Sequence, residues 1–290
     1  MPTIAIVGAQ GFLGQKISEL FRSQGWKVSS LSRKPESEKI NGAHFVNLFD
    51  TSSLREVIAT VQPDVVLSTA WYTEHGEFWN HLSNLAYRDA TLAFAETCFD
   101  LDVKTFIGIG TMSEYGVSPG ICNSDFSVPN PYDLYSKSKL ETGLSLRRIG
   151  EKSGRQTHWA RVFQAFGPNE KRERFVPSLI GNLRKGINFP IRAPNYVMDW
   201  IHSEDVASAI YFALVNELDH FVDIGTGVPT SVKSFAELIC SELDLDRSFL
   251  DFTHHIPDQK KIAVVDTKTQ LFQRGWSPKA SLADRIKSLR

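Results

Sequence analysis

The chain has 290 residues, of which 42% are hydrophobic and 22% are charged, and this balance excludes intrinsically disordered and fibrous proteins. Its formal net charge of −1 gives no overall field that would attract nucleic acid or an anionic membrane surface. The length predicts either two domains or one large α/β domain with an appendage. Because we recognise no signal peptide and no apolar run long enough to cross a bilayer, we expect a cytoplasmic location.

Short runs rich in β-branched residues alternate with amphipathic segments through the first two thirds of the chain. The predicted strands are Thr3–Val7, Lys27–Leu31, Ala43–Val46, Asp64–Thr69, Lys104–Ile109 and Trp159–Phe163. The predicted helices are Phe12–Ser23, a segment capped by Asp50 and ending at Val61, Glu77–Phe99, and a segment that has Pro131 at its first position and ends at Lys152. This alternation predicts an α/β fold, in which helices cover both faces of a doubly wound parallel sheet.

Beyond Pro168 the pattern loosens into short elements, a charged loop and several prolines. We therefore predict a first domain of residues 1–166, to which residues 199–226 return. Residues 167–198 and 227–290 are predicted to form a smaller C-terminal lobe.

A glycine-rich loop directly follows the first predicted strand. Gly8, Gly11 and Gly14 form the pattern G-x-x-G-x-x-G at the junction between strand and helix. Glycines permit a tight turn and let backbone N–H groups approach a pyrophosphate, and the helix N-terminus adds a favourable dipole. The loop therefore predicts a Rossmann-type dinucleotide-binding domain; glycines that serve only a tight turn are the alternative.

The end of the second predicted strand bears on which dinucleotide is bound. NAD-binding sites usually have an acidic residue here for the ribose 2′-hydroxyl, whereas this chain has Ser32 followed by Arg33 and Lys34. A hydroxyl and two cations suit the 2′-phosphate of NADP, so we predict NADP in preference to NAD. The alternative is a solvated basic turn before Pro35.

Tyr135 and Lys139 lie four residues apart in a predicted helix and therefore share one of its faces. A nearby ammonium group is expected to lower the pKa of the phenol, which would let Tyr135 exchange a proton near neutral pH. The spacing is commonplace by itself. It gains weight because the pair follows the fifth strand of a chain that begins with a dinucleotide loop.

In this order the motifs resemble those of the extended short-chain dehydrogenase/reductase superfamily, in its branch of NAD-dependent epimerases and dehydratases of nucleotide sugars. The resemblance extends over essentially the whole chain. Further matching segments are 47–50, 67–70, Asn84, 110–116, 161–168, 199–207 and 275–278.

The resemblance implies a catalytic site. Tyr135 would be the general acid/base acting on a sugar oxygen, Lys139 would lower its pKa and hold the nicotinamide ribose, and Thr111 would hydrogen-bond the reacting oxygen. A plain hydroxyl at a strand end is the alternative for Thr111. The expected cofactor contacts are Gly8, Gly11, Phe12, Leu13, Gly14, Ser32, Arg33, Lys34, Asn47, Leu48, Thr69, Ala70, Trp71, Asn84, Tyr135, Lys139 and Phe163.

The resemblance also implies a small-molecule nucleotide-sugar substrate. Met198 stands where nucleotide-sugar epimerases usually have an arginine on the diphosphate, so other arginines are needed as candidates. The expected substrate contacts are Tyr72, Ser113, Gln164, Arg172, Arg174, Phe175 and Arg192. A solvated charged loop is the alternative for the arginines, as burial in the core is for Trp71 and Tyr72.

Relatives that dehydrate 4-keto sugars place an acidic residue two positions after the catalytic threonine. Met112 and Ser113 occupy those places here, and Glu114 is one position late and, on a strand, would point to the opposite face. We therefore predict an NADPH-dependent reductase of a 4-keto nucleotide sugar rather than a 4,6-dehydratase. The alternatives are a nucleotide-sugar 4-epimerase with tightly bound NAD and a non-catalytic NADP-sensing regulator, a class that tends to lose the tyrosine.

Family analogy alone predicts a homodimer. No metal is expected, because His254 and His255 have no further ligand at a suitable spacing. Cys98, Cys122 and Cys240 form neither a metal-binding spacing nor a disulfide framework, which favours a reducing compartment.

Overall fold

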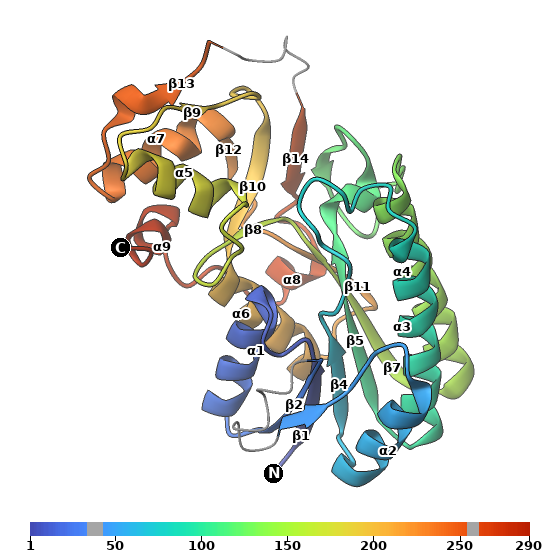
Figure 1. Ribbon diagram of the computed structural model, residues 1–290. Helices are drawn as coiled ribbons and strands as arrows, with labels where there is room; N and C mark the ends of the chain where they lie inside the picture. The colour runs from blue at the N-terminus through green and yellow to red at the C-terminus, as the bar shows by residue number, and fades with distance from the viewer. Residues whose placement is uncertain (34–42, 254–260) are drawn as a thin grey trace.

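The computed structural model describes residues 1–33, 43–253 and 261–290. Within these residues one seven-stranded parallel sheet forms the larger part of the molecule, and a smaller lobe lies beyond the carboxyl ends of its strands (Figure 1). From one edge to the other the strands are β11 (Phe221–Ile224), β7 (Gln156–Val162), β5 (Thr105–Thr111), β4 (Val65–Ser68), β1 (Thr3–Val7), β2 (Lys27–Ser32) and β3 (Ala43–Phe45). The predicted Rossmann-type fold is confirmed.

Side-chain alternation assigns the two faces of this sheet. In β1, Ile4 and Ile6 enter one buried cluster, whereas Ala5 and Val7 enter the cluster on the opposite face. Both faces of a parallel sheet are covered by helices, so its strands need apolar residues at consecutive positions. This is why the strands could be recognised in the sequence as continuous β-branched runs.

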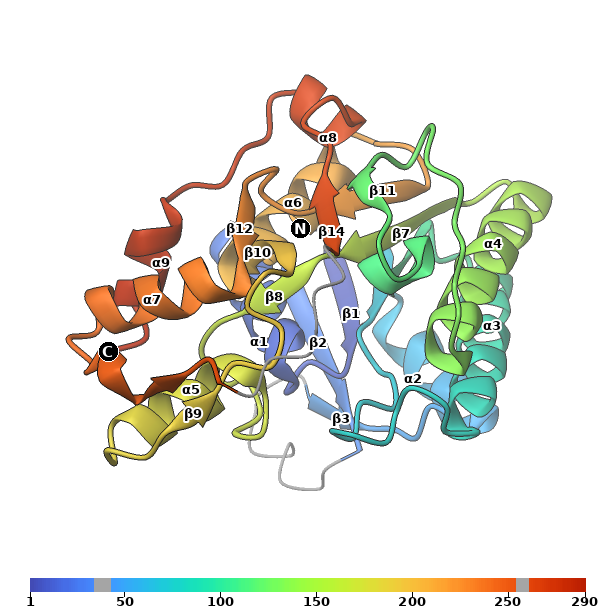
Figure 2. The same ribbon diagram turned by 90° about the horizontal axis from the view of Figure 1, so that it is seen from above.

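Helices cover the sheet in two layers, and Figure 2 shows them on opposite sides of the strands. One face carries α1 (Phe12–Ser23) and α6 (Ser203–Val215). The other face carries α2 (Thr51–Val61), α3 (Ser83–Asp100) and α4 (Leu134–Ser153). The order of strands reverses between β1 and β4, and ligands of such sheets bind outside the carboxyl ends at this switch point.

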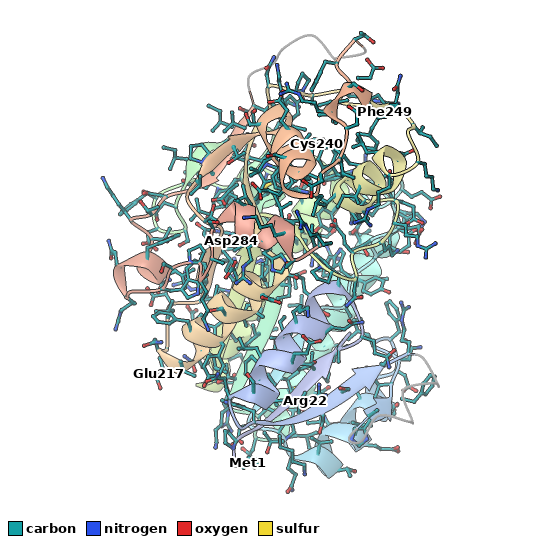
Figure 3. All side chains as sticks on the ribbon, turned by 90° about the vertical axis from the view of Figure 1, so that its left-hand side faces the viewer. Met1, Arg22, Glu217, Cys240, Phe249 and Asp284 are labelled. Carbon is teal, nitrogen blue, oxygen red and sulfur yellow. The ribbon has the colours of Figure 1, made fainter. Side chains whose placement is uncertain are left out.

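The lobe has its own sheets and its own core. Its elements are β6 (Gly120–Cys122), β8 (Gln164–Phe166), β9 (Phe189–Pro190), β10 (Val197–His202), β12 (Pro229–Ser231), β13 (Leu250–Asp251), β14 (Ile262–Val265), α5 (Phe175–Leu183), α7 (Val232–Glu242) and α9 (Leu282–Lys287). Trp200 and Phe235 stack at 3.9 Å between ring centroids at the centre of the core. Figure 3 shows Cys240 and Phe249 in this lobe, at the opposite end of the molecule from Met1 and Arg22.

The predicted division of the chain is crossed in both directions. Strands β6, β8 and β10, expected wholly or partly in the first domain, pair within the sheet of the lobe. Helix α8 (Gln270–Gln273) lies in a range that was expected in the lobe. Leu271 and Trp276 nevertheless pack into the cluster between the main sheet and α1 and α6.

Two predicted helix starts were wrong. Helix α4 begins at Leu134 rather than Pro131, because the Asp133 carboxylate accepts a 2.7 Å hydrogen bond from the N–H of Ser136 and so caps the first turn. Helix α3 begins at Ser83 rather than Glu77. The amide of Asn84 donates to the carbonyls of Phe78 and His81, which holds the preceding segment in turns instead of a helix.

Within the described residues, no helix combines the length and the apolar character that crossing a membrane requires.

Candidate active site

The glycine loop fits a phosphate because it leaves no room for side chains. Gly8 has a φ of 79°, and a Cβ there would collide with the hydroxyl of Thr69. A Cβ on Gly14 would collide with the carbonyl of Gly8. Gly11 caps α1 without a side-chain hydrogen bond, and no acidic residue lies in the first turn. The N–H groups of this turn are therefore arranged to receive an anion.

The other predicted cofactor contacts have different exposures. Those that are partly or fully exposed are Phe12 and Leu13 at the start of α1, and Arg33, Asn47, Thr69 and Ala70 in the segments that follow the strands. Those that are buried are Ser32, Leu48, Trp71, Asn84 and Phe163. Lys34 lies outside the described residues. The fold thus brings the exposed members to one edge of the sheet, whereas Leu48 and Phe163 lie in hydrophobic clusters.

Asn84 lies beneath the predicted cofactor surface rather than on it. Its carboxamide oxygen accepts a 2.8 Å hydrogen bond from the indole of Trp71, and its nitrogen donates to two backbone carbonyls. These contacts fix the Trp71 ring, which in turn lies against Lys139. A direct contact between Asn84 and the cofactor stays a prediction.

The predicted catalytic residues come together from β5 and α4. Thr111 is the last residue of β5, and its hydroxyl is hydrogen-bonded to that of Tyr135. The N–H of Tyr135 donates to the carbonyl of Trp79 at 2.9 Å, which fixes the first turn of α4. Because β5 is parallel to β1, its carboxyl end, and with it this group, lies on the same side of the sheet as the glycine loop that follows β1.

Lys139 lies in an apolar setting. Its ammonium donates a 2.6 Å hydrogen bond to the carbonyl of Ile109 and lies 3.8 Å from the centroid of the Trp71 ring. Burial lowers the pKa of Lys139 to about 7, and the negative charge of Glu114 opposes that change. The amine is therefore poised to gain or lose a proton near neutral pH.

The pKa of Tyr135 departs from the sequence expectation. Burial raises it to about 12, while the hydrogen bond with Thr111 acts in the opposite direction. The expected lowering by Lys139 is not found, because Lys139 is itself desolvated and directs its ammonium to a carbonyl. At neutral pH Tyr135 is therefore a protonated phenol, which is the form that donates a proton.

Glu114 corrects a second expectation. It lies on the 3-10 helix η2 (Met112–Tyr115) and not on a strand, and its side chain is fully buried. The carboxylate faces inward, where it forms a 2.8 Å ion pair with Arg161. The sequence offered a signal in the pair Thr111 and Glu114, since a threonine followed three residues later by glutamate is typical of a capping box.

The predicted substrate contacts are only partly assembled. Arg174 lies 5.3 Å from the centroid of Phe78 and lowers the pKa of Tyr135 through its charge, so it lies near the predicted catalytic tyrosine. Tyr72 stacks on His81, and Phe175 packs against Trp200. Ser113 donates its N–H to the hydroxyl of Thr111, and Gln164 lies on β8 beside β10. Arg172 and Arg192 are exposed.

Sequence reasoning missed three residues beside the site. Phe78 and Trp79 meet the ring of Tyr135 edge-on, with ring centroids 4.9 and 5.8 Å away. Burial raises the pKa of Glu170 to about 7, and Arg174 opposes this change. Two adjacent aromatic residues just before a polar helix start were the available signal for the first two; no motif indicated Glu170.

In the part of the chain that the structure describes, no cluster of potential metal ligands occurs. His254 and His255 lie outside that part.

Comparison with known proteins identifies the family. The model of the NAD dependent epimerase/dehydratase family matches residues 4–225. The chain belongs to this family. Members of the family are enzymes of the extended short-chain dehydrogenase/reductase class, among them epimerases, dehydratases and reductases.

Curated relatives differ in their reactions. The trifunctional UDP-glucose 4,6-dehydratase/UDP-4-keto-6-deoxy-D-glucose 3,5-epimerase/UDP-4-keto-L-rhamnose-reductase of Arabidopsis thaliana is 24% identical over 98% of this chain, which spans only 46% of that protein. The dTDP-6-deoxy-L-talose 4-dehydrogenase (NAD(P)(+)) of Kitasatospora kifunensis is 21% identical over 99% of this chain and 94% of its own length.

Solved structures with the same fold include two epimerases. A UDP-N-acetylglucosamine 4-epimerase from Methanobrevibacter ruminantium M1, in complex with UDP-N-acetylmuramic acid, has a TM-score of 0.86 at 18% identity, and the match covers 99% of this chain and 96% of that chain. A UDP-glucose 4-epimerase from Thermotoga maritima, with UDP-glucose, has a TM-score of 0.83 at 20% identity, and the match covers 99% of this chain and 96% of that chain.

Proposed function

We propose that this member of the epimerase/dehydratase family is an NADPH-dependent reductase of a 4-keto nucleotide sugar, with Tyr135 as the general acid. The observation that carries the proposal is the contact of Tyr135 with Thr111 at the carboxyl edge of the sheet, beside the glycine loop. A nicotinamide bound there supplies the hydride.

The chain's own residues supply the proton and its orientation. The raised pKa of Tyr135, about 12, keeps the phenol protonated at neutral pH, as reduction of a carbonyl requires. Thr111 orients that hydroxyl, and Phe78 and Trp79 cover the ring. Lys139 lies on the same face of α4, with its ammonium 5.9 Å from the centroid of the Tyr135 ring, and is placed to hold the nicotinamide ribose.

NADP is favoured at the end of β2. Ser32 ends the strand where an acidic residue would meet a ribose 2′-hydroxyl, and the next residue, Arg33, is exposed. A carboxylate would repel a 2′-phosphate, whereas a hydroxyl and a guanidinium bind one. A net reductase consumes reduced cofactor, so a preference for NADPH fits reduction better than epimerisation.

The residues that follow Thr111 also bear on whether the protein could catalyse a 4,6-dehydration. Met112 and Ser113 directly follow Thr111, and the nearby Glu114 carboxylate is engaged by three donors inside the protein. A 4,6-elimination needs an acid and a base beside the sugar, and these positions provide neither. This favours reduction over dehydration.

The 4-dehydrogenase from Kitasatospora kifunensis supports the choice of carbon, because the reverse of a 4-dehydrogenation is the reduction of a 4-ketone. The second candidate is a nucleotide-sugar 4-epimerase, which is favoured by the likeness to two solved 4-epimerases. Arg174, close to Tyr135, is the arginine best placed to meet a substrate.

Substituting Tyr135 tests the proposal. Tyr135→Phe keeps the ring contacts with Phe78 but removes the proton donor, so kcat with a 4-keto nucleotide sugar should fall about a thousandfold. NADPH affinity, measured by fluorescence titration, should change by less than about threefold. Tyr132→Phe is the matched control, since Tyr132 is exposed before the start of α4, and it should keep wild-type kcat. Wild-type turnover by Tyr135→Phe would sink the assignment.

A further inference from the structure

The reaction outlined above leaves one fully buried carboxylate unexplained. Glu114 lies directly behind Thr111, three residues along the chain, and shows no exposed surface. Burying a charge is costly unless partners satisfy it. The partners of Glu114 therefore indicate what the charge does.

Three donors hold the carboxylate. One oxygen accepts hydrogen bonds from the N–H of Thr111 at 3.0 Å and from the indole N–H of Trp159 at 2.9 Å. The other accepts from Nε of Arg161 at 2.8 Å. Glu114 thus fixes the backbone of a residue whose hydroxyl meets Tyr135, while its charge is balanced by Arg161.

Trp159 connects this carboxylate to α4. A Cβ added to Gly143, on α4, would lie 2.7 Å from the indole, and one added to Gly110 would lie 2.7 Å from the Glu114 carboxylate. The indole therefore packs closely against both β5 and α4 and fills the space between them. The hydrogen-bonded pair of Glu114 and Trp159 therefore contacts both β5, which ends at Thr111, and α4, which carries Tyr135 and Lys139.

We infer that Glu114 is a positioning residue of the reaction, which holds Thr111 by its backbone N–H and locks the Trp159 indole between β5 and α4. The inference deepens the proposed function and rests on it for the roles of Thr111, Tyr135 and Lys139. It adds a further requirement for the reaction, namely the negative charge of Glu114 behind the hydroxyls of Thr111 and Tyr135.

The charge acts on both titrating groups. Glu114 raises the pKa of Lys139 and that of Tyr135. Among the described residues, Asp133 at the start of α4 and Arg174 in the segment before α5 also act on Tyr135. Arg161 on β7 pairs with Glu114 and is also balanced by Asp223. Neutralising Glu114 would remove the charge that raises the pKa of Lys139, so that pKa should fall further.

Three substitutions separate position from charge. Glu114→Asp keeps the charge but is one methylene shorter, so it loses reach to the Thr111 N–H. Glu114→Gln keeps the length but loses the charge. Tyr115→Phe is the matched control, because it removes the hydroxyl that bonds Arg161 and Asp223 in the same network and leaves the contact between Glu114 and Thr111 intact.

Two readouts follow. Steady-state kinetics with NADPH and a 4-keto nucleotide sugar should show an about tenfold lower kcat at unchanged KM for Glu114→Asp, since a misplaced Thr111 affects the reacting geometry more than binding. Carbon-13 NMR of labelled lysines, with the Lys139 signal assigned by its loss in Lys139→Met, should show Lys139 titrating roughly one pH unit lower in Glu114→Gln than in wild type. Tyr115→Phe should match wild type in both.

The inference is overturned if Glu114→Asp keeps kcat within twofold of wild type, or if Lys139 titrates at the same pH in Glu114→Gln. Should Glu114→Gln fail to fold, the double substitution Glu114→Val with Arg161→Met replaces the ion pair by apolar groups. The kcat and the titration of Lys139 are then measured on that variant. The NMR titration needs no substrate. A failure of the proposed reductase function, seen as turnover by Tyr135→Phe, is therefore distinct from a failure of this inference.

Discussion

Single residues decide how closely a pyrophosphate can approach α1. Gly14 is buried at the point where the first turn passes the carbonyl of Gly8, and a Cβ there would collide with that carbonyl. The collision is with backbone, which cannot move aside as a flexible side chain does. The residue is therefore needed as glycine for reasons of space.

Gly14→Ala should weaken NADPH binding at least about tenfold, because the loop must open to admit the methyl group. Gly181→Ala is the matched control: Gly181 lies within α5 and a Cβ there meets open space. That change should leave NADPH affinity intact and stabilise the fold by up to about 1 kcal/mol. Equal NADPH dissociation constants for the two variants would contradict the assigned role of the loop.

The proposed catalytic residues show what sequence reasoning can and cannot reach at this scale. Spacing and order suffice to single out Tyr135 and Lys139, because residues four apart always share a helical face. The direction of the Tyr135 pKa depends on how much water surrounds the pair, and no local pattern records that. Glu114 was placed on a strand because the end of β5 cannot be told from the start of η2 by alternation alone.

At the scale of elements, the partly buried His220 joins α4 to the edge strands of the sheet. His220 lies with one ring nitrogen 2.8 Å from the carbonyl of Gly143 on α4 and the other 2.7 Å from the hydroxyl of Thr157 on β7. Burial lowers the pKa of His220 to about 4, and that of the neighbouring His158 likewise. Both rings are neutral in the folded protein at neutral pH.

The contribution of these two histidines to the unfolding free energy should decrease in acid. An unfolded histidine titrates near its ordinary pKa of about 6.5, so between that pH and about 4 the unfolded state binds more protons than the folded state. The stabilisation is therefore complete above about pH 6.5 and is lost as the pH falls. Each such histidine should cost about 2 kcal/mol of unfolding free energy between pH 7 and pH 5.

The raised pKa values of Asp223 and Glu170, both about 7, act in the opposite direction, so the test compares variants. Urea denaturation at both pH values should show that His220→Gln, which keeps hydrogen-bonding groups at the site, loses about 2 kcal/mol less than wild type between pH 7 and pH 5. Identical losses in the two proteins would show that His220 does not titrate on unfolding.

Element boundaries were predictable where local chemistry fixes them. Helices α1 and α2 end and begin as expected, since a glycine loop or a capping Asp50 marks their starts. The start of α3 depends on Asn84 reaching back to two carbonyls, a contact that exists only once Trp71 is in place. The start of α4 is set by the capping residue Asp133 and not by Pro131, so the proline is a poor guide to this boundary.

At the scale of the whole molecule, one arginine ties the lobe to the main domain. Arg285 on α9 forms two hydrogen bonds, of 2.8 and 2.6 Å, with the buried carboxylate of Asp205 on α6, and it also pairs with Glu204. The Asp205 side chain is 2% exposed, so its charge depends on this partner.

Arg285→Ala should lower the unfolding free energy by about 3 kcal/mol, because it leaves a buried carboxylate without its cation. Arg290→Ala removes the exposed pair with Asp244 and should cost less than about 1 kcal/mol. Chemical denaturation of both variants checks this. Equal destabilisation would mean that the contact between α6 and α9 contributes no more than a surface ion pair.

The alternating pattern of the first two thirds of the chain predicted the main sheet, because a parallel sheet covered on both faces imposes continuous apolar strands. The lobe was less predictable. Its strands, such as β9 and β13, have only two residues each, and their pairing joins segments some 60 positions apart, for example Leu250 with Phe189. Neither length nor periodicity marks such elements before the chain is folded.

The most direct test of the proposed function is the stoichiometry of NADPH consumption with a 4-keto nucleotide sugar. We expect one NADPH to be oxidised for each ketone reduced, with the loss of NADPH absorbance abolished in Tyr135→Phe. Interconversion of 4-hydroxy sugars without net change in cofactor would contradict reduction and identify the protein as an epimerase.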